Sequence, residues 1–532
     1  MRIPSTINEN CLKTYTPHKK LLELDKINSF KFDEWDDKIP KSLREQCVEC
    51  IARNWSELQV LDEIVLNEDK HLLLDVLPVE LKLELTIPKI NDEVYWKKCC
   101  VHRWPKKVPD IKTQTEAIEI VREGIRENKG FFSNVSDRHT TNKSASSSSN
   151  SSSRKTSGKS SLKGNAQEQQ QVKTWKKFYC EMHVKDYLEN LKPEEYNPEK
   201  IKELCDLCGP YVQILRIQQM ISSENSPNKI PLNSVITGLP HLTELHLRFK
   251  QVYAKEEFSW NMVNTSLHDI HLLAKGLEKT RLTKLSITNS DIDCEKLIHI
   301  LKPLLKHDVI TLDFSRCKIG DKALIALSKF VLERPVRELY IANNRIGPKG
   351  VISLAYATNQ EGCNLKKLDL SLNRVSNNAG IILMKAMKTV KSLLLRSCGF
   401  SENFKMAGHL NSCLEELDLS NNALGEIMGR KILQALKSNS KIRKIDLRMC
   451  QIPSEIETEI QNELVLNRKG VKNVAASTDL DEIVWDDDVV MEFNHVLTSE
   501  HEDELKITSR LIPCHEESDT IASVHRAGET SD

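Results

Sequence analysis

The chain contains 532 residues, which predicts three to four domains, or fewer if part of it is a repeat array. Lys plus Arg and Asp plus Glu both number 76, so the charge balance does not favour a nucleic-acid partner. No apolar run approaches the roughly 18 residues of a membrane span, and the opening MRIPSTINENCLK lacks the apolar core of a secretory signal. The 15 cysteines are therefore expected to be reduced thiols in the cytoplasm.

An N-terminal tail (residues 1–19) is expected to precede a mostly helical domain over residues 20–130. Within that domain, SLREQCVECIARNWSELQVL has helical spacing. The spacing predicts one apolar face made of Leu43, Cys47, Cys50, Ile51 and Trp55.

Residues 131–173 are rich in Ser and Gln, which predicts a disordered, basic linker. Nine Lys or Arg residues stand against one Glu between Arg138 and Lys177. Two interpretations stay open: a solvated linker, or a contact with an acidic polymer such as a microtubule. The sequence GKS at Gly158 resembles the end of a phosphate-binding loop, but Ser153 stands where that loop needs glycine.

A helical cap (residues 174–211) is predicted to shield the first turn of a solenoid that spans residues 212–470. The solenoid is indicated by the pattern L-x-x-L-x-L-x-x-N/C-x-L, which is typical of leucine-rich repeats. The pattern recurs eight times, with a degenerate opening copy near Val212; the copies start at Leu242, Leu282, Val309, Val336, Leu365, Val390, Leu414 and Ile442. Their spacing is 24–29 residues except for one of 40, which predicts an insertion near residues 250–270.

Places one, four, six and eleven of each copy are expected to point inward and to form a continuous core. The Asn or Cys at place nine is expected to bond inward-facing backbone at the end of each strand. Helical segments follow the strands, for example from Gly320 and from Gly347. These features predict an α/β fold, a ribonuclease-inhibitor-like horseshoe with parallel strands on its concave side and helices on its convex side.

Places three, five and seven are expected to point onto the concave face. A protein-binding surface is predicted there, and the alternative is a solvated sheet with no partner. Tyr340 and Leu394 are its strongest candidates, because aromatic and buried contacts dominate binding energy. The full candidate set is Asp313, Tyr340, Asp369, Leu394, Asp418, Asp446, Arg396 and Arg448.

No cofactor, metal or catalytic residue is predicted. Two C-x-x-C pairs, at Cys47 and at Cys205, are separated by the Ser-rich tract, so thiols on apolar helix faces are the simpler interpretation than zinc. The tail over residues 471–532 is acidic and is expected to be disordered, with Trp485 and Phe493 as docking residues.

Two segments outside the repeats, LPVELKLELTIPKINDEVYWKKCC from Leu77 and WKKFYCEMHVKDYLENLKPEEYNPEKIKELCDLC from Trp175, resemble the T-complex-associated testis-expressed protein 1 family. That family is subunit 5 of the nexin–dynein regulatory complex of motile cilia and flagella. The resemblance implies a non-enzymatic scaffold that helps to regulate axonemal dynein and sperm motility. Its implied partners are other subunits of that complex and, directly or indirectly, the doublet microtubules, with no membrane or nucleic acid.

Two alternatives remain open. A GTPase-activating protein of the Ran type and an enzyme inhibitor of the ribonuclease-inhibitor type also use such repeats. Cytoplasm, cytoskeleton and the axoneme of a cilium or flagellum are the locations that the resemblance implies.

Overall fold

The computed structural model describes residues 41–107, 174–223, 225, 227–252, 258–404, 413–470, 483, 485 and 487–495. The chain divides into two compact units, Met1–Lys176 and Lys177–Asp532. The basic sequences around Gly158 and the remainder of the predicted linker lie outside the described residues.

Within residues 41–107, the first unit forms the helices α3 (Leu43–Arg53), α4 (Asn67–Val76), α5 (Leu83–Thr86) and α6 (Glu93–Arg103). Ser42 and Glu45 form a capping box at the start of α3, which satisfies backbone N–H groups that the first turn leaves free. The core collects large side chains, and the indole of Trp55 donates a hydrogen bond to the Leu85 carbonyl (3.2 Å).

The predicted apolar face of α3 is wrong except at Trp55. The helix buries Val48 and Ala52, and Trp55, just beyond its end, is buried as predicted, whereas Leu43 is 77% exposed and both Cys47 and Cys50 are exposed. Val48 and Ala52 have the same four-residue spacing as Leu43 and Cys47, so periodicity alone supports two stripes. The helix packs against α4, and the buried residues within it are Val48 and Ala52.

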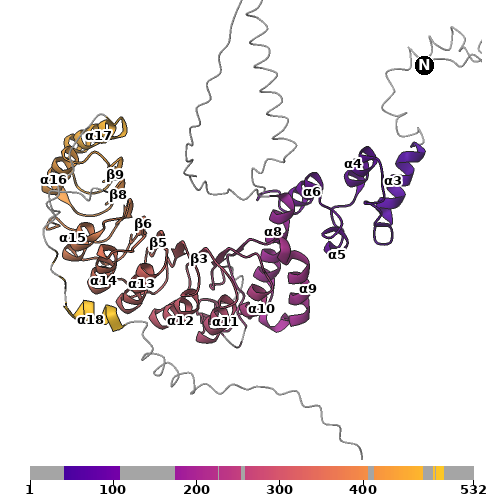
Figure 1. Ribbon diagram of the computed structural model, residues 1–532, viewed down its shortest axis with the longest axis horizontal. Helices are drawn as coiled ribbons and strands as arrows, with labels where there is room; N and C mark the ends of the chain where they lie inside the picture. The colour runs from indigo at the N-terminus through magenta and orange to yellow at the C-terminus, as the bar shows by residue number, and fades with distance from the viewer. Residues whose placement is uncertain are drawn as a thin grey trace, which may run out of the picture. The chain divides into compact units, whose positions relative to one another are not determined.

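The second unit is a solenoid built on one parallel sheet of nine strands in chain order (Figure 1). The strands are β1 (Ile214–Ile217), β2 (Glu244–Leu247), β3 (Lys284–Ile287), β4 (Thr311–Asp313), β5 (Glu338–Tyr340), β6 (Lys367–Asp369), β7 (Ser392–Leu394), β8 (Glu416–Asp418) and β9 (Lys444–Asp446). The predicted fold class is confirmed, and the degenerate copy near Val212 is a true first turn, because Leu215 pairs in register with Leu245.

Helices cover the outer side of this sheet, and the strands line the inner side of the curve (Figure 1). Before the sheet come α8 (Trp175–Asn190), η3 (Pro193–Glu195), α9 (Pro198–Cys208) and η4 (Gly209–Tyr211). Along it lie α10 (Leu232–Thr237), η5 (Trp260–Met262), α11 (Leu267–Leu277), α12 (Cys294–Leu304), α13 (Asp321–Glu333), α14 (Pro348–Asn359), α15 (Asn377–Ala386), α16 (Gly425–Lys437) and α17 (Ser454–Arg468).

Each turn buries the side chains at the predicted inward places. Leu365, Leu368 and Leu370 are fully buried, and Val375 is nearly so. Neighbouring turns stack these residues into one continuous apolar core, which is the main stabilising contribution available to a solenoid.

The residue at place nine joins consecutive turns, as predicted. Asn373 accepts from the backbone N–H groups of Asn344 (3.1 Å) and Ile346 (3.3 Å). Its amide donates to the carbonyls of Ile341 (3.0 Å) and Leu370 (2.8 Å). Cysteines at this place also donate: the Cys398 thiol reaches the Leu370 carbonyl at 3.5 Å. Burial raises the pKa of Cys398 to about 12, so it acts as a buried thiol donor.

Place eight is left-handed in seven consecutive turns, which the repeat pattern did not predict. The residues with positive φ are Asn289, Arg316, Asn343, Leu372, Ser397, Asn421 and Met449. This conformation lets the chain turn sharply from the strand toward the place-nine residue, and it is costly for most residues other than Gly and Asn.

Met449 is the place-eight residue best suited to a stability test, since its side chain is 78% exposed and its φ is +60°. Met449→Asn is expected to raise the free energy of unfolding by up to about 1 kcal/mol, because Asn tolerates this conformation better. Met449→Val is expected to lower it, because a branched Cβ suits positive φ least. Urea denaturation of the two variants checks this, and equal midpoints would contradict the assignment of strain.

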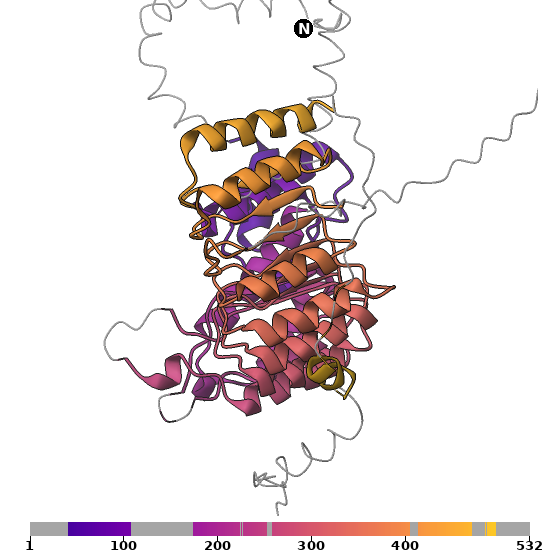
Figure 2. The same cartoon turned by 90° about the vertical axis from the view of Figure 1, so that its left-hand side faces the viewer.

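The helix α18 (Asp487–His495) lies against α13 and α14, on the convex side of the solenoid (Figures 1 and 2). Phe493 packs with Ile325 and Ala357. The Trp485 and Phe493 rings each meet the Tyr356 ring edge-on, with centroids 5.2 Å apart in both pairs. The two aromatic residues expected to dock therefore do so on this chain's own helices.

Candidate protein-binding face

Parallel pairing places equivalent residues of successive strands side by side across the concave face. The row at place five runs through the nine strands in the order Arg216, His246, Ser286, Asp313, Tyr340, Asp369, Leu394, Asp418 and Asp446. The six predicted residues of this row, from Asp313 to Asp446, are half-buried and adjacent in space.

Each aspartate of the row bonds the backbone two residues further along the chain. Asp313 accepts from the N–H of Ser315 (3.0 Å), and Asp369 accepts from that of Ser371 (2.9 Å). Asp418 accepts from both the N–H (2.9 Å) and the hydroxyl (2.6 Å) of Ser420. These Asx-type bonds fix the end of each strand, so the acidic residues have a structural role whether or not a partner contacts them.

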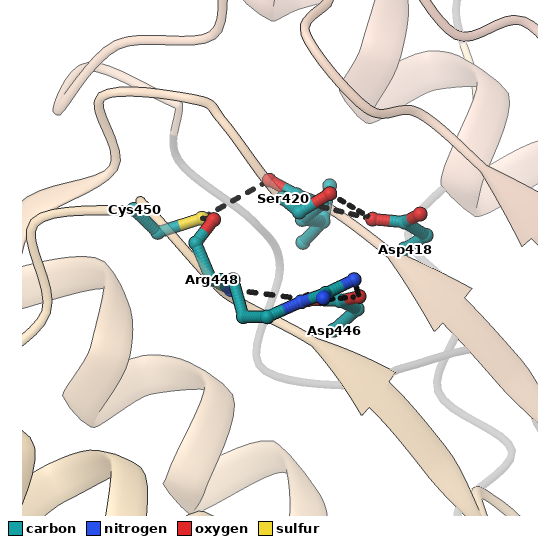
Figure 3. A network of polar contacts seen from close by, with 6 residues as sticks. Asp418, Ser420, Asp446, Arg448 and Cys450 are labelled. Carbon is teal, nitrogen blue, oxygen red and sulfur yellow. Dashed lines mark hydrogen bonds and ion pairs between the residues drawn. The ribbon is translucent and has the colours of Figure 1, made fainter.

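Asp446 and Arg448 form a closed ion pair at the last turn (Figure 3). The guanidinium of Arg448 donates to both carboxylate oxygens of Asp446, at 2.9 and 3.0 Å from Nε. This hydrogen bonding lowers the pKa of Asp446. Because Arg448 is exposed, the pair contributes little to stability.

Tyr340 lies at the centre of the row, in contact with two charged neighbours. Its hydroxyl donates to Glu338 (3.1 Å), and the Lys367 ammonium lies 5.2 Å from its ring centroid. Burial raises the pKa of Tyr340, and the hydrogen bond with Tyr340 raises the pKa of Lys367, so both side chains keep their protons at neutral pH. The contacts hold the ring in place, and a fixed aromatic ring is a good anchor for a partner.

Leu394 is a half-buried apolar residue on β7, two strands from Tyr340, with Asp369 and Asp418 as its paired neighbours. Arg396, at place seven of the same turn, is exposed. The concave face around β5–β9 therefore combines two apolar anchors with charges of both signs.

The first four strands carry a different chemistry, which the candidate set missed. A pocket of about 440 Å³ opens on the concave side at their carboxyl ends. Its basic lining residues are Arg216, His246, Arg248 and Arg316, and Asp313 lies at its border with the acidic half of the row. Arg216 is part of the degenerate first copy of the repeat pattern. Its place beside His246 follows from the pairing of β1 with β2, which the structure shows.

The segment between β2 and α11, within the region where an insertion was predicted, includes η5, which projects from the body of the second unit (Figure 2). This segment carries Phe258 and Trp260, which are 64% and 71% exposed and meet edge-on with centroids 5.3 Å apart. An exposed pair of large aromatic rings is unusual on a surface without a partner.

The described residues show no cluster of three or more metal-ligating side chains and no helix that is long and apolar enough to cross a bilayer. Cys205 and Cys208 are buried in α9, while Cys47 and Cys50 are exposed on α3. Burial raises the pKa of Cys205 to about 11, so this thiol stays protonated at neutral pH.

Comparison with known families identifies the repeats. The sequence model of the Leucine Rich repeat family matches residues 307–328, 334–355, 363–383 and 410–426. Among solved structures, an internalin from Listeria monocytogenes is 18% identical, with a TM-score of 0.28 over 49% of this chain and 68% of that one. The actin-binding site 2 of leiomodin-1 is 16% identical, with a TM-score of 0.20 over 38% of this chain and 91% of that one.

Curated relatives carry the name Dynein regulatory complex subunit 5. The Macaca fascicularis protein is 28% identical over 348 residues, and the Mus musculus protein is 25% identical over 353 residues. The alignments cover 61% and 62% of this chain, respectively, and 58% of either relative. The Chlamydomonas reinhardtii protein is 25% identical over 48% of this chain and 49% of its own length. The family resemblance is confirmed, and the chain spans less than two thirds of the length of these relatives.

Proposed function

We propose that this leucine-rich-repeat protein, similar to curated dynein regulatory complex subunit 5, is a non-enzymatic structural subunit of the nexin–dynein regulatory complex of motile cilia and flagella. The observation that supports the role is the similarity to those relatives over about 350 residues. Its location is then the axonemal cytoskeleton. Its partners are other subunits of the complex and, directly or through them, the doublet microtubules. Through these contacts it regulates axonemal dynein and motility.

Binding uses the half-buried row on β4–β9. The nine strands share one hydrogen-bonded sheet, so their concave face is a rigid surface on which anchors hold fixed positions. Tyr340 and Leu394 supply the contact energy, while the aspartates, Arg396 and Arg448 orient the partner by charge.

The role is tested by expressing the tagged chain in motile ciliated cells that lack their own copy, and by extracting the axonemes with detergent. Retention along the axoneme together with other regulatory-complex subunits is expected. A diffuse, detergent-soluble protein would overturn the proposal. Faster GTP turnover by a small GTPase on adding the protein would instead favour the GTPase-activating alternative.

The binding surface is tested in the same cells with Tyr340→Ala combined with Leu394→Ala. Loss of two anchors is expected to reduce retention by about tenfold or more, since single anchors commonly contribute about 2 kcal/mol. The matched control is Ile427→Ala, which removes an exposed apolar side chain (67%) from α16 on the convex side. Equal retention of the two variants would show that the concave row does not carry the contact.

A further inference from the structure

The pocket at the carboxyl ends of β1–β4 concentrates positive charge in an otherwise mixed surface. Arg216 and His246 come from place five of the first two turns, Arg248 from place seven, and Arg316 from place eight of the fourth turn. The parallel register brings residues that lie up to 100 positions apart in the sequence into one concavity. No other stretch of the place-five row carries consecutive basic residues.

The charges of this pocket are only partly neutralised within the chain. Glu244 pairs with Arg216 (3.5 Å) and with His246 (3.4 Å). Asp313 is engaged by the N–H of Ser315 and by the hydroxyl of Ser286 (3.1 Å). Among the described residues, neither Arg248 nor Arg316 has an ion pair, and both are exposed. Two guanidinium groups are therefore free to bind carboxylates.

The two exposed aromatic residues lie on the segment that joins β2 to α11, and this segment continues from Arg248 at the carboxyl end of β2. Its base is fixed: Gln251 donates from its backbone to the Met262 carbonyl (2.8 Å), and the buried Lys229 ammonium donates to the Asn261 carbonyl (2.7 Å). Phe258 and Trp260 are thus held at the surface by an ordered base, which lowers the entropy lost when a partner binds.

We propose that the pocket binds an acidic peptide segment of a partner protein, whose carboxylates pair with Arg248 and Arg316 while an apolar residue of the same segment packs on Phe258 and Trp260. Guanidinium groups match carboxylates in a two-bond geometry, and aromatic rings add contact area. The site is separate from the Tyr340–Leu394 surface, and it does not depend on the axonemal role.

A protein segment fits this site better than a nucleic acid. The acidic half of the place-five row begins at Asp313, inside the pocket, and would repel a continuous phosphate backbone. The charge of the whole chain is also balanced, with 76 residues of each sign. A short acidic peptide can end before it reaches the aspartates of the place-five row, so it avoids this repulsion.

The test measures binding of a short, fluorescein-labelled, glutamate-rich peptide that contains one Phe, by anisotropy on the full chain. Binding is expected to weaken as ionic strength rises from about 0.05 to about 0.3 M. Arg248→Glu with Arg316→Glu is expected to raise the Kd by about tenfold or more. The matched control is Arg430→Glu with Lys437→Glu, the same charge change at two exposed residues of α16, which is expected to leave the Kd within about twofold.

The aromatic contact is tested separately. Trp260→Ala is expected to weaken binding of the Phe-containing peptide and to leave binding of the same peptide with Ser in place of Phe unchanged. Circular dichroism confirms that each variant is folded, which is expected because the substituted residues are exposed.

Three results would overturn the proposal. The first is no binding, or an equal loss of binding in the Arg248→Glu, Arg316→Glu double variant and in the Arg430→Glu, Lys437→Glu control. The second is tighter binding of a single-stranded RNA of equal charge, which would make the site a nucleic-acid site. The third is a marked gain in peptide affinity when Glu500, Glu502, Asp503 and Glu504 are changed to their amides in the full chain. That gain would assign the pocket to the chain's own acidic segment.

Discussion

Asn373→Ala is expected to lower the free energy of unfolding by about 3–4 kcal/mol, since each buried polar group left without a partner costs about 1–3 kcal/mol. The amide of Asn373 is buried and joins two consecutive turns through two accepted and three donated hydrogen bonds. Alanine removes all five and leaves backbone groups of both turns unsatisfied in the core. Urea denaturation followed by circular dichroism measures the change.

Two controls separate this role from a general effect of losing asparagine. Asn373→Cys keeps one donor at the place that Cys398 occupies in the next turn, so an intermediate loss is expected. Asn364→Ala removes an exposed amide that bonds only the nearby Gly362 carbonyl, so little change is expected. If the two alanine variants unfold at the same urea concentration, the place-nine residues do not hold the turns together.

Phe493→Ala is expected to release α18 from the solenoid. Phe493 is almost fully buried against α13 and α14, and truncating a buried Phe costs about 3–5 kcal/mol. A nine-residue helix has little stability of its own, so it is not expected to stay folded once its anchor is lost. Hydrogen exchange of the full chain should show lost protection over residues 487–495 and new exposure on α13 and α14.

Met491→Ala is the matched control for this experiment. Met491 lies on the same helix, but its side chain is 60% exposed, so protection of α18 should be unchanged. Continued protection of residues 487–495 in Phe493→Ala would show that Trp485 and Val489 hold the helix without it. In that case, a substitution at Tyr356, whose ring contacts both Trp485 and Phe493, tests the solenoid side of the same contact.

The repeat period was sufficient to predict most of the solenoid. Spacing of 24–29 residues located the strands, and the four apolar places identified the buried side chains. The polar residue at place nine was also interpretable, because a small buried donor at a strand end needs backbone partners. These features are local, and each copy of the pattern supports the others.

Two features of the individual turns were not predictable in the same way. The aspartates of place five looked like a binding stripe, yet each also closes a turn onto the residue two positions later. In the sequences LDFS and LDLS, the serine two positions after the aspartate was the feature that could have indicated this hydrogen bond to the backbone. The left-handed place eight was visible only where Asn occupies it, since Arg316, Leu372, Ser397 and Met449 give no such signal.

The basic pocket and the docking of α18 required the folded structure. The pocket exists because a degenerate copy adds β1 to the sheet and brings Arg216 beside His246. The helix α18 packs on residues of α13 and α14, such as Ile325 and Ala357, which lie outside the positions that the repeat pattern specifies. On α3, two stripes of equal period were available, and tertiary contacts decided between them.

The unbroken register of the nine strands fixes the distances between binding residues on different turns of the second unit. Strands in a sheet are about 4.8 Å apart, so Arg248 on the second turn and Asp418 on the eighth are separated by six steps, or about 29 Å. Insertion or deletion of one whole repeat would change that separation in a single step of about 4.8 Å without altering either chemistry. The number of turns between the basic and acidic ends thus sets the spacing at which two partners can be held.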